Sequence, residues 1–245
     1  MKMIVNPEYK QYTAMIESIP KLFDTSGRTI YKNRNEIKVF DMSGIAINVK
    51  RYKAPFFINR IIYTFFRKTK AQRAYSYALR LLAKGFDTPS PIAYILYKKK
   101  GLICHSYFIS MQSSCQRDMY EFGKGLLSGR ESIISSLARY TSMLHDSGVY
   151  HNDYSPGNIL FQQTGEDVKF TLVDINRMRF HPVSIQKGCA NFARLWGGDD
   201  MFRLLAREYA VARHSDIADC TRWVFLYRKR FWKKYTRKHE MPFEL

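Results

Sequence analysis

The sequence predicts an α+β protein of two lobes, a small antiparallel β-sheet lobe followed by a mostly helical lobe. Its 245 residues, 46% of them hydrophobic, are enough to bury one large core or two small ones. In the first half apolar and polar residues alternate as in strands, whereas in much of the second half apolar residues recur at helical spacing. A polar connector at Ser113–Arg117 separates the two patterns. We therefore expect lobes over residues 1–112 and 113–245.

The first lobe is expected to have the order β-β-β-α-β-β after a short N-terminal helix that ends near Pro20. Three antiparallel strands are expected in TIYKN, EIKVFDMSG and IAINVKRYK. Helical spacing is then expected from Ile58 to Lys84, where RAYSYALRLLAKG repeats apolar residues at three- and four-residue intervals and stops at Gly85. Two further strands, IAYILYK and LICHSYFISMQ, complete this lobe.

The second lobe is expected to begin with a long helix from about Glu131 to His145. A loop, HNDYSPGN, follows this helix and leads into a strand pair formed by ILF and FTLVDI. From Asn191 onward the pattern predicts mostly helix.

Composition excludes several classes of protein. The abundance of Phe and Tyr argues against intrinsic disorder. The four cysteines stand far apart without a C-x-x-C pair, which argues against a zinc ribbon or disulfide framework and suits a reducing compartment. There is no apolar run of eighteen residues, and the N-terminus lacks the apolar stretch of a signal peptide. We therefore expect a cytoplasmic location.

Forty Lys and Arg residues against 21 Asp and Glu residues give a net charge of +19, which predicts an anionic partner. The charge is concentrated in two blocks rich in aromatic residues. No acidic residue occurs between Asp41 and Asp87, and a second basic and aromatic block runs from Arg222 to Glu240. Each block alone could equally be a solvated helix face whose apolar side packs on the core.

Two short segments carry the residue types of phosphoryl-transfer chemistry. In the first, His151, Asp153 and Asn158 match the spacing of the protein-kinase catalytic loop H-R-D-x-x-x-x-N, with Asn152 in place of the arginine. In the second, Asp174 ends a strand where the aspartate of D-F-G would lie. A carboxylate can accept the proton of an acceptor hydroxyl, and amide and carboxylate oxygens suit magnesium. His151 and His145 are expected to brace the structure by packing and hydrogen bonds.

The chain resembles the lipopolysaccharide core kinases, the Kdo and heptose kinase family of Gram-negative bacteria, over roughly residues 27–196. The resemblance is carried by GRTIYKNRNEIKVF, INVKRYKAP, NRIIYTFFRKTKAQRAY, GFDTPSPIAY, HSYFISMQ, LHDSGVYHNDYSPGNILF and VDINRMRF. It looks closest to the Kdo-kinase-like branch of Bacteroides-type bacteria. The resemblance implies a two-lobed protein-kinase-like fold, with a nucleotide-binding lobe followed by a catalytic lobe.

The resemblance also implies ATP and Mg²⁺ as cofactors and assigns roles to the matching residues. By it, Asp153 is the catalytic base, and Asn158 and Asp174 hold magnesium. Lys50 binds the α- and β-phosphates, and Met111 to Ser113 form the adenine hinge. Arg34, in the turn between the first two expected strands, would help to cover the phosphates.

The sequence departs from the kinase pattern in three places. It lacks the glycine-rich G-x-G-x-x-G loop, so Arg34 and backbone N–H groups would have to serve instead. Ser76 stands where a helix glutamate is expected to pair with Lys50; another carboxylate, such as Glu36, could replace it. Lys53 is an alternative to Lys50 if the strand register differs.

The implied reaction is ATP-dependent phosphorylation of a Kdo or heptose hydroxyl in the lipopolysaccharide inner core. The acceptor is linked to lipid, so we expect peripheral association with the inner face of the cytoplasmic membrane through the basic-aromatic blocks, first PFFINRIIYTFFRKTK and then the segment from Arg222. Arg177 and Arg179 could contact the acceptor or brace the loop.

Two other functions are alternatives to this reaction. One is that of a pseudokinase that binds anionic lipid or glycan, and the other is that of a kinase for a soluble small molecule. Nucleic acid is not an expected partner, because no DNA- or RNA-binding module is recognisable.

Overall fold

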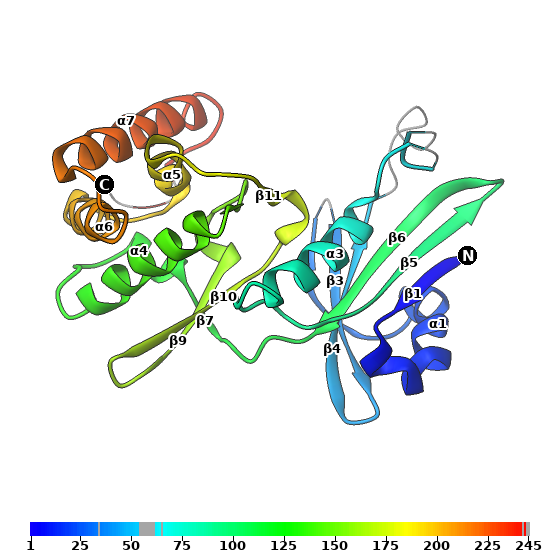
Figure 1. Ribbon diagram of the computed structural model, residues 1–245. Coiled ribbons are helices and arrows are strands. Elements are labelled where there is room, and N and C mark those ends of the chain that lie inside the picture. The colour runs from blue at the N-terminus through cyan, green and yellow to red at the C-terminus, as the bar shows by residue number, and fades with distance from the viewer. Residues whose placement is uncertain (34, 54–61, 65, 242, 244–245) are drawn as a thin grey trace. The chain divides into compact units, whose positions relative to one another are not determined.

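The structure is a computed structural model that describes residues 1–33, 35–53, 62–64, 66–241 and 243. The chain folds into two compact units. Unit 1 consists of Met1–Ser114 and Ile175–Arg177, and unit 2 of Cys115–Asp174 and Met178–Leu245. Unit 1 is built on one antiparallel sheet and unit 2 is mostly helical (Figure 1). The predicted α+β fold class is thereby confirmed.

Six antiparallel strands form the sheet of unit 1, in the order β1-β5-β6-β4-β3-β2. The three consecutive strands predicted from the alternating pattern are β2 to β4, and the two that follow the predicted helix are β5 and β6. The strand bounds are β1 (Lys2–Val5), β2 (Arg28–Lys32), β3 (Asn35–Met42), β4 (Ile45–Tyr52), β5 (Pro91–Lys99) and β6 (Leu102–Met111).

The N-terminus departs from the prediction of a single short helix. It begins with β1, continues as a 3-10 helix, η1 (Pro7–Tyr12), and only then forms α1 (Thr13–Leu22). β1 exists because it pairs with β5 far along the chain, from Lys2 opposite Leu96 to Val5 opposite Ala93. Four residues are too few for a periodic pattern to reveal such a strand. α1 ends at Leu22, near Pro20 as expected, and Pro20 itself lies inside the last turn.

Two helices cover opposite faces of this sheet. On one face α1 buries Ile16 and Ile19 among sheet residues that include Val49. On the other face α3 (Lys70–Leu82) buries Tyr75 among sheet residues that include Tyr52. Because side chains alternate along a strand, odd-numbered residues of β4 face α1 and even-numbered residues face α3.

The described part of unit 2 contains four α-helices and two small sheets. The helix predicted from Glu131 to His145 is α4 (Glu131–Asp146), and the predicted strand pair is β9 (Ile159–Thr164) with β10 (Asp167–Leu172). No helix among the described residues combines the length and apolar character needed to cross a bilayer. The remaining elements are β7 (Arg117–Asp118), η2 (Met119–Gly123), β8 (Val149–Tyr150), η3 (Pro156–Asn158), β11 (Arg179–Phe180), α5 (Ile185–Asn191), η5 (Phe192–Arg194), α6 (Asp199–Ala212) and α7 (Ile217–Tyr235).

A chain of buried hydrogen bonds joins α4, α5 and α6 of unit 2 to the start of the HNDYSPGN loop. The His145 ring bonds to the Tyr209 hydroxyl at 2.8 Å and to the Asn191 side chain at 3.0 Å, and Asn191 donates in turn to the backbone carbonyl of His151 at 3.0 Å. Burial lowers the pKa of His145 to about 4. A Cβ at Gly188 would lie 1.9 Å from the Tyr209 hydroxyl, so only glycine fits there. His145 is packed at its helix end, as expected.

Candidate functional site

His151 fixes the start of the HNDYSPGN loop, which connects β8 to β9. Its ring is fully buried, and Nδ1 accepts a hydrogen bond from the Asp153 N–H at 3.2 Å. Nε2 therefore carries the proton and donates to the Val173 carbonyl at 3.0 Å. Burial lowers the pKa of His151, which keeps the ring neutral. The expectation that His151 braces the loop is confirmed.

Asn158 folds the loop back on itself. Its Nδ2 donates to the Asp153 backbone carbonyl at 2.8 Å and to the Ser155 hydroxyl at 3.0 Å. The Ser155 N–H also donates to the Asp153 carbonyl, at 2.9 Å. With its nitrogen committed to these acceptors, Asn158 directs its other polar atom, Oδ1, away from them. Asp153 and Asn158 are thus brought together inside unit 2.

Asp174 follows β10 on a segment that is hydrogen-bonded to this loop. The Val173 N–H donates to the Asn158 carbonyl at 3.0 Å, and the Val173 carbonyl accepts the bond from His151. Asp174 itself has a φ of 51°, in the left-handed region, which is sparsely populated by residues other than glycine and is often found at functional sites. The segments that carry Asp153, Asn158 and Asp174 therefore lie side by side.

The donor set of this region fits a hard divalent cation. Asn158 offers an amide oxygen and Asp174 a carboxylate, and magnesium takes one or two such protein ligands together with water and phosphate oxygens. Both residues are half-buried, which leaves part of each side chain accessible. No cluster of three or more His, Cys, Asp or Glu side chains with metal-binding geometry occurs in the described part of the chain. The residues thus suit magnesium shared with a phosphate ligand.

Arg194 is a residue of this site that the sequence did not reveal. It lies at the end of η5, and its guanidinium forms an ion pair with the Asp153 carboxylate. The Arg194 side chain is 37% exposed and that of Asp153 19% exposed. Burial lowers the pKa of Arg194. No motif connects two positions so far apart, so only the folded structure brings them together.

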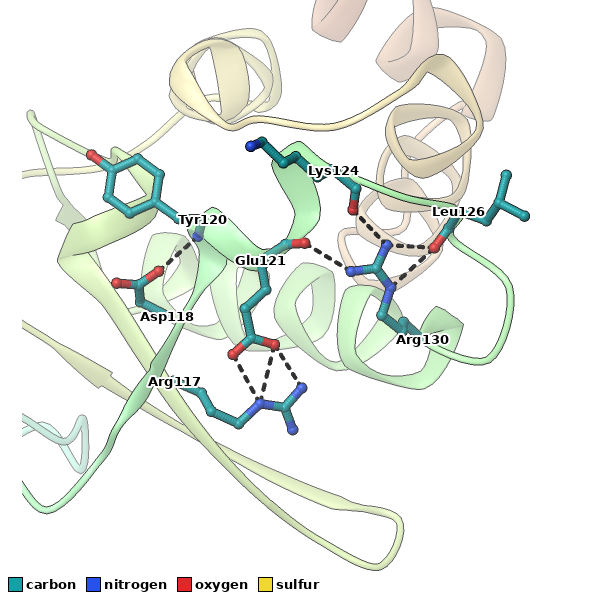
Figure 2. A network of polar contacts seen from close by, with 7 residues as sticks. All are labelled: Arg117, Asp118, Tyr120, Glu121, Lys124, Leu126 and Arg130. Carbon is teal, nitrogen blue, oxygen red and sulfur yellow. Dashed lines mark hydrogen bonds and ion pairs between the residues drawn. The ribbon is translucent and has the colours of Figure 1, made fainter. Parts of the chain in front are cut away.

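The loop is also supported from η2. A Cβ at Gly157 would lie 2.6 Å from the Tyr120 ring, which shows how closely that ring packs on the loop, and Tyr120 packs edge-on against Trp196 with centroids 4.4 Å apart. Figure 2 shows the polar contacts that hold η2 in this position. They comprise the Arg117–Glu121 ion pair, the Asp118 carboxylate on the Tyr120 N–H, and the Arg130 guanidinium on the carbonyls of Glu121, Lys124 and Leu126.

In unit 1, Lys50 lies on the sheet face that α3 covers, with its ammonium 5.5 Å from the centre of the Tyr52 ring. Lys53 lies just beyond the end of β4 and is exposed. Of the predicted hinge, Met111 ends β6 and donates its N–H to the Ser90 carbonyl at 2.9 Å. Ser113 follows it, and its carbonyl accepts from the Gln112 side chain at 3.3 Å.

Glu36 is not the partner of Lys50, contrary to the expectation. Its carboxylate forms an ion pair with Arg51 at 2.7 Å and a longer one with Lys32 at 4.0 Å. Glu36 stands directly opposite Arg51 in the β3–β4 register, so both side chains lie on the sheet face covered by α1. Lys50, the residue before Arg51 on β4, points to the other face.

Where the kinase pattern expects a helix glutamate, α3 makes a different contact. Ser76 is half-buried there, and Arg73, one helical turn earlier, donates from Nε to the Asn176 carbonyl at 3.1 Å. Asn176 belongs to η4 (Ile175–Arg177), the part of the D-I-N-R segment that packs in unit 1. The helix thus holds this turn through a backbone carbonyl. Arg177 and Arg179, the other basic residues of this region, are both exposed.

A cavity of about 680 Å³ lies on the α1 face of the sheet, opposite to the face that carries Lys50. Residues of α1 line it together with Arg51, His105 and Tyr107 of β4 and β6. Its walls carry charges of both signs, including Glu17 and Lys21. It is therefore separate from the predicted phosphate-binding lysine.

Two predicted features lie wholly or partly outside the described residues. Arg34 is one of them. Half of PFFINRIIYTFFRKTK, the first choice for a membrane-facing segment, is the other.

Three comparisons place these observations beside known proteins. A model of the lipopolysaccharide kinase (Kdo/WaaP) family matches residues 26–196. The fold is similar to that of WaaP in complex with acyl carrier protein, with a TM-score of 0.66 at 14% identity over 96% of this chain and 99% of the other. It is also similar to a microcompartment-associated aminopropanol kinase, with a TM-score of 0.54 at 9% identity over 93% and 90% of the two chains. A search of curated proteins found no match.

Proposed function

This chain belongs to the lipopolysaccharide kinase (Kdo/WaaP) family, and from this premise we propose that it transfers the γ-phosphoryl group of ATP to a Kdo or heptose hydroxyl of the lipopolysaccharide inner core. The acceptor is linked to lipid, so the reaction is proposed to take place at the inner face of the cytoplasmic membrane. We also propose that the chain belongs to the Bacteroides-type, Kdo-kinase-like branch of this family.

The observation that carries the proposal is the hydrogen-bonded arrangement of Asp153, Asn158 and the segment that holds Asp174 in unit 2. In the proposed step, the Asp153 carboxylate accepts the proton of the acceptor hydroxyl. The acceptor oxygen forms its bond to the γ-phosphorus while the bond from that phosphorus to the β–γ bridging oxygen breaks, and ADP leaves. Asn158 Oδ1 and the Asp174 carboxylate would hold magnesium, which supplies neutralising charge to the phosphate oxygens when bound.

We propose that the nucleotide is bound by residues of unit 1. Lys50 would pair with the α- and β-phosphates, and Met111 to Ser113 would contact the adenine. We propose that Arg34 helps to cover the phosphates of ATP.

The experiment that tests this function measures transfer of radiolabelled γ-phosphate from ATP to Kdo-lipid A. Asp153→Asn removes the base while conserving its shape, and we expect kcat to fall about 10²- to 10⁴-fold. Asp167→Asn is the matched control, because Asp167 is an exposed aspartate at the start of β10 in the same unit. Circular dichroism and thermal unfolding would establish that both variants are folded. Unchanged turnover in Asp153→Asn would remove the proposal.

The pseudokinase alternative rests on one observation, the absence of a helix glutamate at Ser76. It proposes that the chain holds anionic lipid or glycan without turnover. Isothermal titration with ATP and Mg²⁺ separates the two proposals, because the enzyme requires nucleotide binding. A kinase for a soluble small molecule is tested in the same transfer assay with choline and aminoglycosides as acceptors.

We propose that α7 contributes the contact with the anionic membrane surface. Five of its basic residues are exposed, and the helix interleaves them with aromatic side chains that are only partly buried. Such a combination suits the interface between water and lipid headgroups. The basic residues are Arg222, Lys229, Arg230, Lys233 and Lys234, and the aromatic residues are Trp223, Phe225, Tyr227, Phe231 and Tyr235.

A further inference from the structure

The loop that carries Asp153 contains no cation of its own. Between Asp153 and Asn158 the chain has only Tyr154, Ser155, Pro156 and Gly157. The cation beside the carboxylate is instead the guanidinium of Arg194, which reaches Asp153 from η5.

Arg194 is held in place from α7. Its guanidinium lies 5.3 Å from the centre of the Phe231 ring. The backbone that follows it is held by Arg228, which donates to the Leu195 carbonyl at 3.3 Å and to the Gly197 carbonyl at 2.6 Å. Arg228 is only 4% exposed, so this attachment is a buried one. Two side chains of α7 thus hold this segment, Phe231 at the guanidinium of Arg194 and Arg228 at the backbone that follows it.

The exposure of the ion pair argues against a purely structural role. With the Arg194 side chain 37% exposed, the pair is accessible to water. The attraction in such a partly exposed pair is screened by water and offset by the lost hydration of the two charges, so the pair adds little to stability. A contribution to stability therefore does not explain why Arg228 and Phe231 hold the segment of Arg194 beside Asp153.

We propose that Arg194 is a positioning residue for Asp153, orienting its carboxylate toward the acceptor hydroxyl in the reaction proposed above, on which this inference rests. The guanidinium keeps all its protons throughout the step. Asp153 alone accepts the hydroxyl proton while the new O–P bond forms and ADP leaves. Arg194 acts by restricting the rotation of the carboxylate, and small errors in the placement of a reacting group are costly to the rate.

The test compares Arg194→Ala and Arg194→Lys with wild type in the γ-phosphate transfer assay. We expect Arg194→Ala to lower kcat about 100-fold, to leave the KM for ATP unchanged, and to leave the thermal unfolding temperature near that of wild type. Arg194→Lys should recover part of kcat, because it restores a cation without the planar fork. Millimolar guanidinium chloride should restore kcat in Arg194→Ala, since the space vacated is open to solvent, whereas equal concentrations of sodium chloride should not.

The matched control is Arg139→Ala, which removes another exposed arginine–carboxylate pair of unit 2, with Glu208 at 3.4 Å. This variant should keep wild-type kcat and show no response to guanidinium. An unchanged kcat in Arg194→Ala would overturn the inference and leave the proposed function standing. So would a loss of kcat that neither guanidinium nor Arg194→Lys restores. If wild type itself fails to transfer phosphate, the proposed function falls, and a role for Arg194 in turnover falls with it.

Discussion

At the scale of single residues, His151 shows how one side chain determines the geometry of the loop. Because Nδ1 accepts from the Asp153 N–H while Nε2 donates to the Val173 carbonyl, only one neutral tautomer satisfies both bonds. A proton added to Nδ1 would turn that acceptor into a donor and break the bond to Asp153. Full burial, which lowers the pKa of His151, keeps that proton away at neutral pH. The loop therefore depends on an uncharged imidazole.

From the second buried imidazole, that of His145, we expect the free energy of unfolding to depend on pH. Its pKa is about 4 in the folded protein against 6.5 for an exposed histidine, because burial penalises the charged form. The unfolded chain therefore binds a proton first as the pH falls. The stability that the neutral ring provides is complete above about pH 6.5 and is lost as the pH falls toward 4, amounting to about 3 kcal/mol. Urea unfolding between pH 7.5 and pH 4.5 measures it.

The control for this prediction is His145→Gln, which cannot titrate in this range. Its free energy of unfolding should fall less steeply with decreasing pH than that of wild type. Some slope will remain, because His151 has a lowered pKa and acts with the same sign. Parallel slopes in the two proteins would contradict the role given to His145.

At the scale of elements, α7 owes its attachment to a buried cation. The Arg228 guanidinium lies 4.0 Å from the centre of the Phe202 ring and donates to two backbone carbonyls of the segment that precedes α6. Burial lowers its pKa to about 10, so it stays charged at neutral pH. The carbonyls of Leu195 and Gly197 thus depend on one side chain for these hydrogen bonds.

Arg228→Met should therefore destabilise the protein by about 3 kcal/mol, because it removes both donors while keeping much of the apolar stem. Arg230→Met is the matched control, since Arg230 is exposed on the same helix, and it should change stability by less than about 0.5 kcal/mol. Urea unfolding at pH 7 measures both. Equal effects of the two substitutions would show that the buried hydrogen bonds contribute nothing beyond the general loss of charge.

The elements differ in how far the sequence could predict them. β3, β4 and α3 were predictable because each is long enough to show its periodicity, and α3 also has a capping box between Thr69 and Gln72. β1 and the two-residue strands could not be predicted, because each is defined only by its pairing with a distant strand.

The residues of the candidate site also differ in how far the sequence could predict them. The spacing of Asp153 and Asn158 lies within one loop and is visible in the sequence, whereas the Arg194 contact exists only after folding.

At the scale of the whole molecule, part of the excess positive charge has a structural use. Lys38 is 7% exposed and donates to the carbonyls of Phe23 and Ser26 at the end of α1. Arg51 pairs with Asp24 and Glu36 on the same sheet face. These cations contribute to the net charge from which the sequence suggested an anionic partner, so charge alone overstated the surface available for binding. The exposed cations of α7 give a better measure of the positively charged surface that is available to an anionic partner.

If α7 contacts an anionic membrane surface, the triple variant Lys229→Gln, Arg230→Gln, Lys233→Gln should bind anionic vesicles about 100-fold more weakly than wild type. Each basic side chain near such a surface contributes about 1 kcal/mol, so three removals give that factor. Lys98→Gln, Lys99→Gln, Lys100→Gln is the matched control, because it makes the same change in net charge on the exposed β5–β6 turn. Sedimentation with phosphatidylglycerol vesicles measures binding, and raising the salt concentration should weaken it. Equal losses in the two triple variants would mean that net charge, and not α7, governs the attraction.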